Sequence, residues 1–126
     1  MSEPSVARKG IGQNDWEEFL KEFTARNKNR RARFNIFYAS GDTVEEAEEG
    51  HLESVSLNKN GDNAQVIVER SDQTTENKET TTNKIENVSA ITVQYDTDGS
   101  EDILEITDAK NTLLSLRFES KVDGVS

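Results

Sequence analysis

The chain lacks cysteine altogether and has one proline, one histidine, one methionine and one tryptophan among its 126 residues. Without cysteine, the protein has neither a disulfide framework nor any thiolate-based zinc, iron–sulfur or nucleophilic site. No apolar run approaches the roughly 20 residues that cross a bilayer, so we expect no membrane span. These absences exclude thiol chemistry, thiolate metal sites and a membrane-spanning segment.

Positive charge is also scarce, because 15 Lys and Arg residues face 25 Asp and Glu residues, which gives a formal net charge of -10. Nucleic-acid binding requires a basic face, so we expect no nucleic-acid partner. The opening Met-Ser-Glu-Pro-Ser lacks the basic and then apolar segments of a signal peptide. We therefore expect a cytoplasmic protein. Hydrophobic residues make up only 32 % of the chain, which limits it to a small core.

One amphipathic helix is predicted near the start. Trp16, Phe19, Leu20 and Phe23 follow the i, i+3, i+4, i+7 spacing of a single apolar stripe, which predicts a helix over residues 14–27. Asn14 with Glu17, or Asp15 with Glu18, would cap its first turn, and Asn27 and Asn29 suit its end. Such a stripe usually packs a helix onto a sheet.

From residue 31 the apolar period changes from 3.6 to 2, which indicates strands. Turn signals separate the strands, including Asn60-Gly61, expected to form a type I′ turn, and Asp98-Gly99. The expected strands are residues 31–38, 51–57, 64–70, 90–95, 103–106 and 113–118. Residues 40–50 read as an acidic loop, and residues 71–84 as either a solvated edge strand or a mobile loop.

The expected fold class is α+β, with the N-terminal helix packed on an antiparallel meander of five to seven strands. A partly closed barrel plugged by the helix is the favoured variant, because closure removes exposed sheet edges. We expect a flexible leader over residues 1–12, one domain over residues 13–120 and a flexible tail over residues 121–126.

Candidates for chemistry are few. His51 is the single histidine, and one imidazole without a nucleophile beside it makes no catalytic site. Residues 96–102 place oxygen ligands at alternate positions, as in a calcium loop. Their glycine, Gly99, and the twelfth position, Thr107, break the calcium pattern, and a hairpin turn explains the segment better. We expect no metal, no cofactor and no catalytic residue.

Two stretches resemble a family of small bacterial proteins that is catalogued as a domain of unknown function. The first is Trp16-Glu17-Glu18-Phe19-Leu20-Lys21-Glu22-Phe23, followed by Asn27 and the strand start at Arg30–Arg33. The second comprises Asp98-Gly99, Leu104-Glu105-Ile106 and Thr112-Leu113-Leu114-Ser115-Leu116. The resemblance spans residues 13–118 and departs within residues 77–90, which lack the His or Pro common there. It implies a bacterial source and no assigned activity, so no site residue transfers.

Three functional hypotheses follow. The first is a non-catalytic protein-interaction or binding module, whose basic strand start (Arg30, Arg31 and Arg33, with Phe37) binds an acidic partner or another copy of the chain. The second is a small-ligand pocket inside a half-open barrel, lined by Trp16, Phe34, Tyr38 and Tyr95. The third, least favoured, is an acid–base enzyme using a carboxylate pair or His51.

Overall fold

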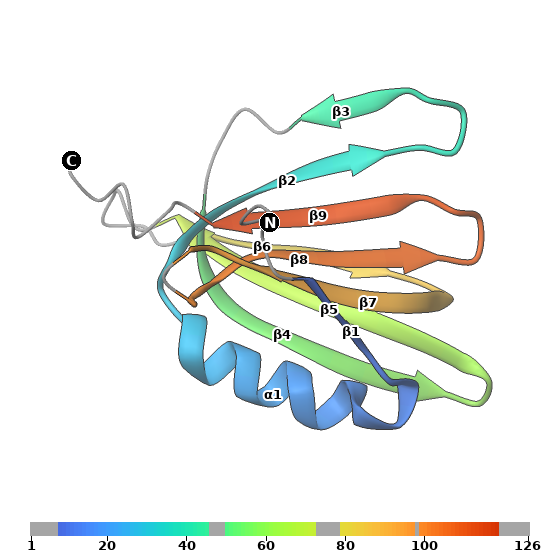
Figure 1. Cartoon of the computed structure of the whole chain (residues 1–126), viewed down its shortest axis with the longest axis horizontal. Coiled ribbons are helices and arrows are strands. Elements are labelled where there is room, and N and C mark those ends of the chain that lie inside the picture. Colours follow the sequence, from blue (N-terminus) through green and yellow to red (C-terminus); the bar gives the residue numbers. More distant parts are fainter. Residues whose placement is uncertain (1–7, 46–49, 73–78, 98, 119–126) are drawn as a thin grey trace, which may run out of the picture.

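The computed structural model is an α+β fold in which one N-terminal helix packs on an antiparallel sheet (Figure 1). It describes residues 8–45, 50–72, 79–97 and 99–118. In this part of the chain, no helix is long and apolar enough to cross a bilayer. The elements are β1 (Arg8–Ile11), a 3₁₀ turn (Gln13–Asp15), α1 (Trp16–Asn27), β2 (Arg31–Phe37), β3 (Thr43–Glu45), β4 (Gly50–Asn60), β5 (Asn63–Asp72), β6 (Glu79–Ile85), β7 (Val88–Tyr95), β8 (Glu101–Asp108) and β9 (Leu113–Phe118).

The predicted helix and its packing face are confirmed. Trp16, Leu20 and Phe23 are buried in the core, where Phe23 lies 5.7 Å from the ring of Phe118 on β9. Neither predicted capping pair is supported at the α-helix itself, because its N-cap Asp15 makes no side-chain cap hydrogen bond. Positive φ at Asn29 turns the chain after the helix into β2, as expected for asparagine in a left-handed conformation.

The sheet is not closed into a barrel. Its strand order is β1-β7-β8-β9-β2-β4-β5-β6, with β3 paired to β2 outside this path. A two-residue link, residues 86–87, joins β6 to β7, yet the two strands are not neighbours in the sheet. The barrel variant predicted from the sequence is therefore wrong, although the antiparallel pairing is confirmed.

The sheet divides at β2. β4 pairs with β2 only at Arg31↔His51 and Ala32↔Gly50 and then leaves it. Farther along, β3 pairs with β2 instead, over residues 35–37. Beyond the point of division, helix α1 bonds to β4. The Thr24 hydroxyl accepts from the Val55 N–H and lies within donating distance of the Val55 carbonyl, at 2.9 Å in both cases.

Nine strands form in the described residues, which exceeds the predicted five to seven. The added strands, β1 and β3, are short and carry too few apolar residues to show a period. Residues 8–11 of the expected leader thus pair with β7, and residues 43–45 of the expected loop pair with β2. Within residues 71–84, β6 is an edge strand, and residues 73–78 lie outside the described part.

The hairpin between β4 and β5 also differs from its prediction. Asn60 pairs with Asn63, so the two central residues are Gly61 and Asp62. Positive φ occurs at Gly61, at +66°, but not at Asp62. This pattern matches a type II′ turn rather than the expected type I′ turn. The turn was located correctly to within one residue.

A buried polar cluster fixes the end of α1 to the start of β8. The Glu101 carboxylate accepts hydrogen bonds from Arg26 Nε at 3.0 Å, Arg26 Nη2 at 2.6 Å and Asn27 Nδ2 at 2.8 Å. The bond to Glu101 raises the pKa of Arg26. Arg30 donates to Asn27 Oδ1 and to the Glu101 carbonyl, and its guanidinium lies 4.4 Å from the centre of the Phe118 ring.

Candidate functional site

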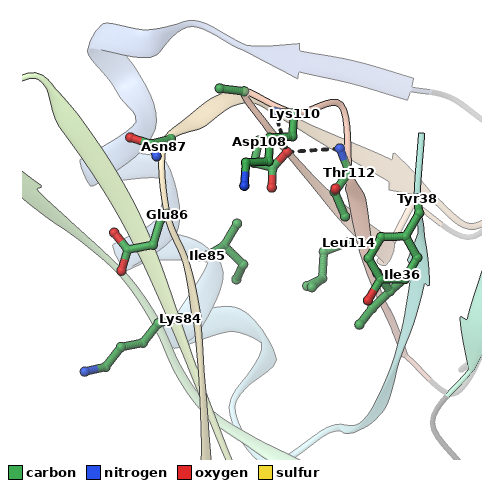
Figure 2. Close-up of a pocket in the computed structure, with 11 residues that line it drawn as sticks. Ile36, Tyr38, Lys84, Ile85, Glu86, Asn87, Asp108, Lys110, Thr112 and Leu114 are labelled. Atoms are coloured by element: carbon green, nitrogen blue, oxygen red, sulfur yellow. Dashed lines mark hydrogen bonds between the residues drawn. The ribbon is translucent and has the colours of Figure 1, made fainter. Parts of the chain in front are cut away.

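A cavity of about 370 Å³ opens between β2, the link from β6 to β7, and the turn from β8 to β9 (Figure 2). We call it the β2 cavity. Its apolar lining comes from three stretches that are far apart in sequence: Ile36 with Tyr38, Ile85, and Ala109 with Leu114. In Figure 2, Ile85 and Leu114 point toward one another from opposite sides of the hollow. The other lining residues are Lys84, Glu86, Asn87, Asp108, Lys110 and Thr112.

The cavity is a consequence of the division at β2. Ala32, Phe34 and Ile36 are alternate residues of one strand and therefore share one face of the sheet. Ala32 and Phe34 are buried in the core, whereas Ile36 is only partly buried. Leu114 is the register partner of Ile36 and lies on the same face. β4 begins at Gly50, opposite Ala32, so no part of β4 lies beside Ile36, where β2 pairs with β3 instead.

Asp108 shapes the rim on the side of β8 and β9. Its Oδ1 accepts from the backbone N–H groups of Lys110, at 2.8 Å, and Thr112, at 3.0 Å. Positive φ at Asn111 completes the turn. The Ala109 N–H donates to the Asn87 carbonyl at 2.9 Å, which joins this turn to the link between β6 and β7. Hydrogen bonds from backbone N–H groups thus hold the rim in place.

The Glu86 carboxylate, on the side of β6, is also hydrogen-bonded. Its carboxylate accepts from Asn63 Nδ2 at 3.0 Å and Gln65 Nε2 at 2.5 Å. These hydrogen bonds lower the pKa of Glu86. In Figure 2, Glu86 and Lys84 extend away from the hollow.

Lys110 differs from these rim acids, because it makes no ion pair with any residue that the structure describes. The rim therefore has carboxylates that are already bonded and an ammonium group without an anionic partner in the described residues.

The basic strand start is only partly a surface feature. Arg31, Arg33 and Phe37 occupy alternate positions on the outer face of β2, whereas Arg30 belongs to the buried cluster around Glu101. Arg33 lies 3.7 Å from Glu45 and is the register partner of Arg117 on β9. Arg31 and Arg33 also have further interactions. The structure thus keeps three of the four predicted residues on one face.

The four side chains predicted to line a ligand pocket are not brought together. Trp16 and Phe34 are buried in the core, where Trp16 Nε1 donates to the Ile11 carbonyl at 2.9 Å. Tyr38 lines the β2 cavity, and Tyr95 lines a different hollow near the end of α1. Ile85, Leu114 and Lys110 line the cavity as well and were not predicted as site residues. Their pattern could have identified strands and a turn, but not the register that makes them neighbours.

The other candidates of the sequence analysis are a metal site and the single histidine. No group of three or more His, Asp or Glu residues among them could hold a metal ion. The segment considered for calcium includes Asp98, which lies outside the described residues. His51 is partly buried in β4, and its Nδ1 is buried without a partner in this part of the chain. It does not line the β2 cavity.

Asp102 gives a pH-dependent prediction. Partial burial, with Asp96 nearby, raises the pKa of Asp102 above its ordinary 3.8, although Arg117 and Arg30 oppose the rise. The folded state then binds more protons than the unfolded state between these two pKa values, so this group's contribution to stability falls as pH rises through them. We expect Asp102→Asn to raise the thermal midpoint near neutral pH, by an amount corresponding to at most about 0.5 kcal/mol, because solvent screens a carboxylate that is only partly buried.

This gain should vanish once the pH falls below the ordinary pKa of 3.8. Thermal unfolding followed by circular dichroism on both sides of that value checks the prediction. A variant that is less stable than the parent near neutral pH would contradict it.

Comparison of the chain with protein-family models, with curated proteins and with solved structures finds no match in any of the three. The resemblance to a bacterial family of unknown function thus stays a prediction.

Proposed function

We propose that the protein is a non-catalytic binding protein of the bacterial cytoplasm that takes a small amphiphilic anion into the β2 cavity. The observation that carries this proposal is the cavity's volume, about 370 Å³, together with its apolar lining by Ile36, Ile85 and Leu114. Ligand sites commonly have volumes of roughly 300–1,000 Å³, with mostly apolar walls and a few polar groups. The proposal develops the ligand-pocket hypothesis with a different set of residues.

The size of the cavity limits the affinity. A short acyl chain such as that of hexanoate buries about five carbon groups, which contribute roughly 0.8 kcal/mol each. The total of about 4 kcal/mol corresponds to a Kd near 1 mM. Larger ligands with a ring system could bind more tightly because they fill more of the hollow.

The charge of the ligand follows from the rim. The Asp108 carboxylate accepts hydrogen bonds from two backbone N–H groups, and the Glu86 carboxylate accepts from two side-chain amides. Lys110 has no ion-pair partner in the described residues. An anionic head group beside Lys110 would complete the site, whereas a cationic head would find both carboxylates already bonded.

Fluorescence titration with the anionic dye anilinonaphthalene sulfonate tests the proposal. The dye should bind the folded protein, and hexanoate should displace it more effectively than hexylamine. Ala109→Trp places a large side chain at the cavity and should weaken dye binding by about tenfold, equivalent to 1.4 kcal/mol. Ala109 is exposed, so the fold should tolerate the change.

Lys59→Trp is the matched control, because Lys59 is exposed on β4 and does not line the cavity. It should leave the dye affinity within about twofold of the parent, as distant surface changes usually do. Equal losses in the two variants, or no loss in Ala109→Trp, would overturn the proposal.

Protein interaction through the outer face of β2 is the second candidate function. Arg33 and Arg117 are cross-strand partners, and like charges placed opposite one another are unfavourable. An acidic partner, or the acidic surface of another copy, would relieve that repulsion. The exposed ring of Phe37 on the same face adds apolar contact area. Ligand binding in the β2 cavity is the preferred function, because the cavity is a concave site. On the outer face of β2, Arg33 already has the Glu45 carboxylate nearby.

A further inference from the structure

β1 is an edge strand of the sheet. It pairs with β7 over residues 8–11 and stands at the end of the strand order, without a second hydrogen-bonded strand in the described residues. Three of its four residues are exposed. An edge strand of this kind presents backbone N–H and C=O groups that an added strand can bond.

A groove separates β1 from α1. It consists of two adjoining hollows, of about 380 Å³ and 410 Å³, which share the lining residues Lys9, Phe19 and Glu22. The first hollow is lined by β1 and the start of α1, and the second continues to Tyr95 and the end of the helix. Ile11, Phe19 and Tyr95 pack against the core while remaining partly exposed, which gives the groove apolar contacts. We call it the α1–β1 groove.

Its charge is predominantly negative. Asp15, Glu18 and Glu22 follow one another along the same side of the helix, at spacings of three and four residues. Like charges at these spacings destabilise a helix by themselves. Among the described residues, the two hollows together contain these three acids and Glu101, against Lys9 and Arg26. Arg26 is bonded to Glu101 and also lies 3.9 Å from Glu22, whereas Asp15 and Glu18 make no ion pair with a described residue. A cationic occupant would reduce the repulsion.

From these observations we infer that the α1–β1 groove binds an extended, cationic segment of a partner protein, which adds a strand to the free edge of β1. The backbone of that segment would bond to β1, its basic side chains would face Asp15 and Glu18, and its apolar side chains would contact Phe19 and Tyr95. This is the arrangement of peptide recognition by strand addition, in which main-chain bonds give affinity and side-chain contacts give specificity. The inference is independent of the proposed function.

Two features favour a foreign partner over a second copy. The chain carries a formal net charge of -10, so two copies repel one another. The free edge of β1 is also short, at four residues, and offers few backbone groups to a strand that lacks complementary charge.

The test uses a labelled eight-residue peptide in which lysine alternates with threonine and valine, and its glutamate counterpart, in fluorescence anisotropy. The lysine peptide should bind and the glutamate peptide should not. Glu18→Lys should weaken binding of the lysine peptide by about tenfold, the usual scale for a charge contact. Glu17→Lys, the matched control, makes the same charge change on the same helix outside the groove and should weaken it less than threefold, as expected for a rim charge.

Hydrogen exchange distinguishes strand addition from general charge attraction. Amides of β1 should exchange more slowly when the lysine peptide is bound, because new backbone bonds protect them. Equal losses in Glu17→Lys and Glu18→Lys, binding of the glutamate peptide, or unchanged exchange in β1 would each overturn the inference. Self-association of the parent protein that the lysine peptide cannot displace would identify a second copy as the occupant and would overturn it as well.

Discussion

Phe23→Ala is expected to destabilise the protein by about 3–5 kcal/mol, the range for removing a buried aromatic side chain. Phe23 is 0 % exposed as the last residue of the helix stripe, and its ring lies 5.7 Å from the rings of both Phe19 and Phe118. Its removal leaves a cavity between α1 and β9 that the fixed sheet cannot fill. Urea unfolding monitored by circular dichroism measures the loss.

Phe37→Ala provides the control, because it removes the same side chain from an outer position of β2 that is 39 % exposed. We expect it to cost less than about 1 kcal/mol. Similar losses in the two variants would show that the helix stripe is not the sealed centre of the core. The packing of α1 on the sheet would then be wrong.

The second large effect concerns the ion pair that fixes the end of α1. A double-mutant cycle with Arg26→Ala and Glu101→Ala should give a coupling energy of about 2 kcal/mol. The Glu101 side chain is 7 % exposed and bonds to two nitrogens of Arg26, which favours strong coupling. The Arg26 side chain is 46 % exposed, so water compensates part of the loss and the coupling stays below that of a fully buried pair.

Arg33 and Glu45 supply the comparison. Their charged groups lie 3.7 Å apart and their side chains are 36 % and 63 % exposed. The same cycle on this pair should give a coupling of at most about 1 kcal/mol. If the two cycles gave the same value, burial of Glu101 would not be the reason for the strength of the first pair.

Much of the fold was predictable because its signals are local. Trp16, Leu20 and Phe23 mark the buried face of a helix by spacing alone, and alternation marks β2. Asn29 ends the helix region through a conformation that asparagine tolerates. The strands β1 and β3 escaped prediction because their partners on β7 and β2, rather than their own residues, stabilise them.

The candidate site was much harder to predict. Ile36, Ile85 and Leu114 become neighbours only through the register of β2 with β9 and through the point at which β4 leaves β2. Sequence patterns do not determine where two strands separate. The run of basic residues predicts Arg30 as a surface cation. In the structure, the Arg30 guanidinium donates to the Glu101 carbonyl and lies over the Phe118 ring, so Arg30 belongs to the cluster around Glu101.

The most direct test of the account is a titration of the isotope-labelled protein with hexanoate, followed by backbone amide chemical shifts. We expect shift changes that saturate near a Kd of about 1 mM and that map to the end of β2, the link between β6 and β7, and the turn between β8 and β9. Shifts that fail to saturate, or that map to the outer face of β2 or to the α1–β1 groove instead, would contradict it.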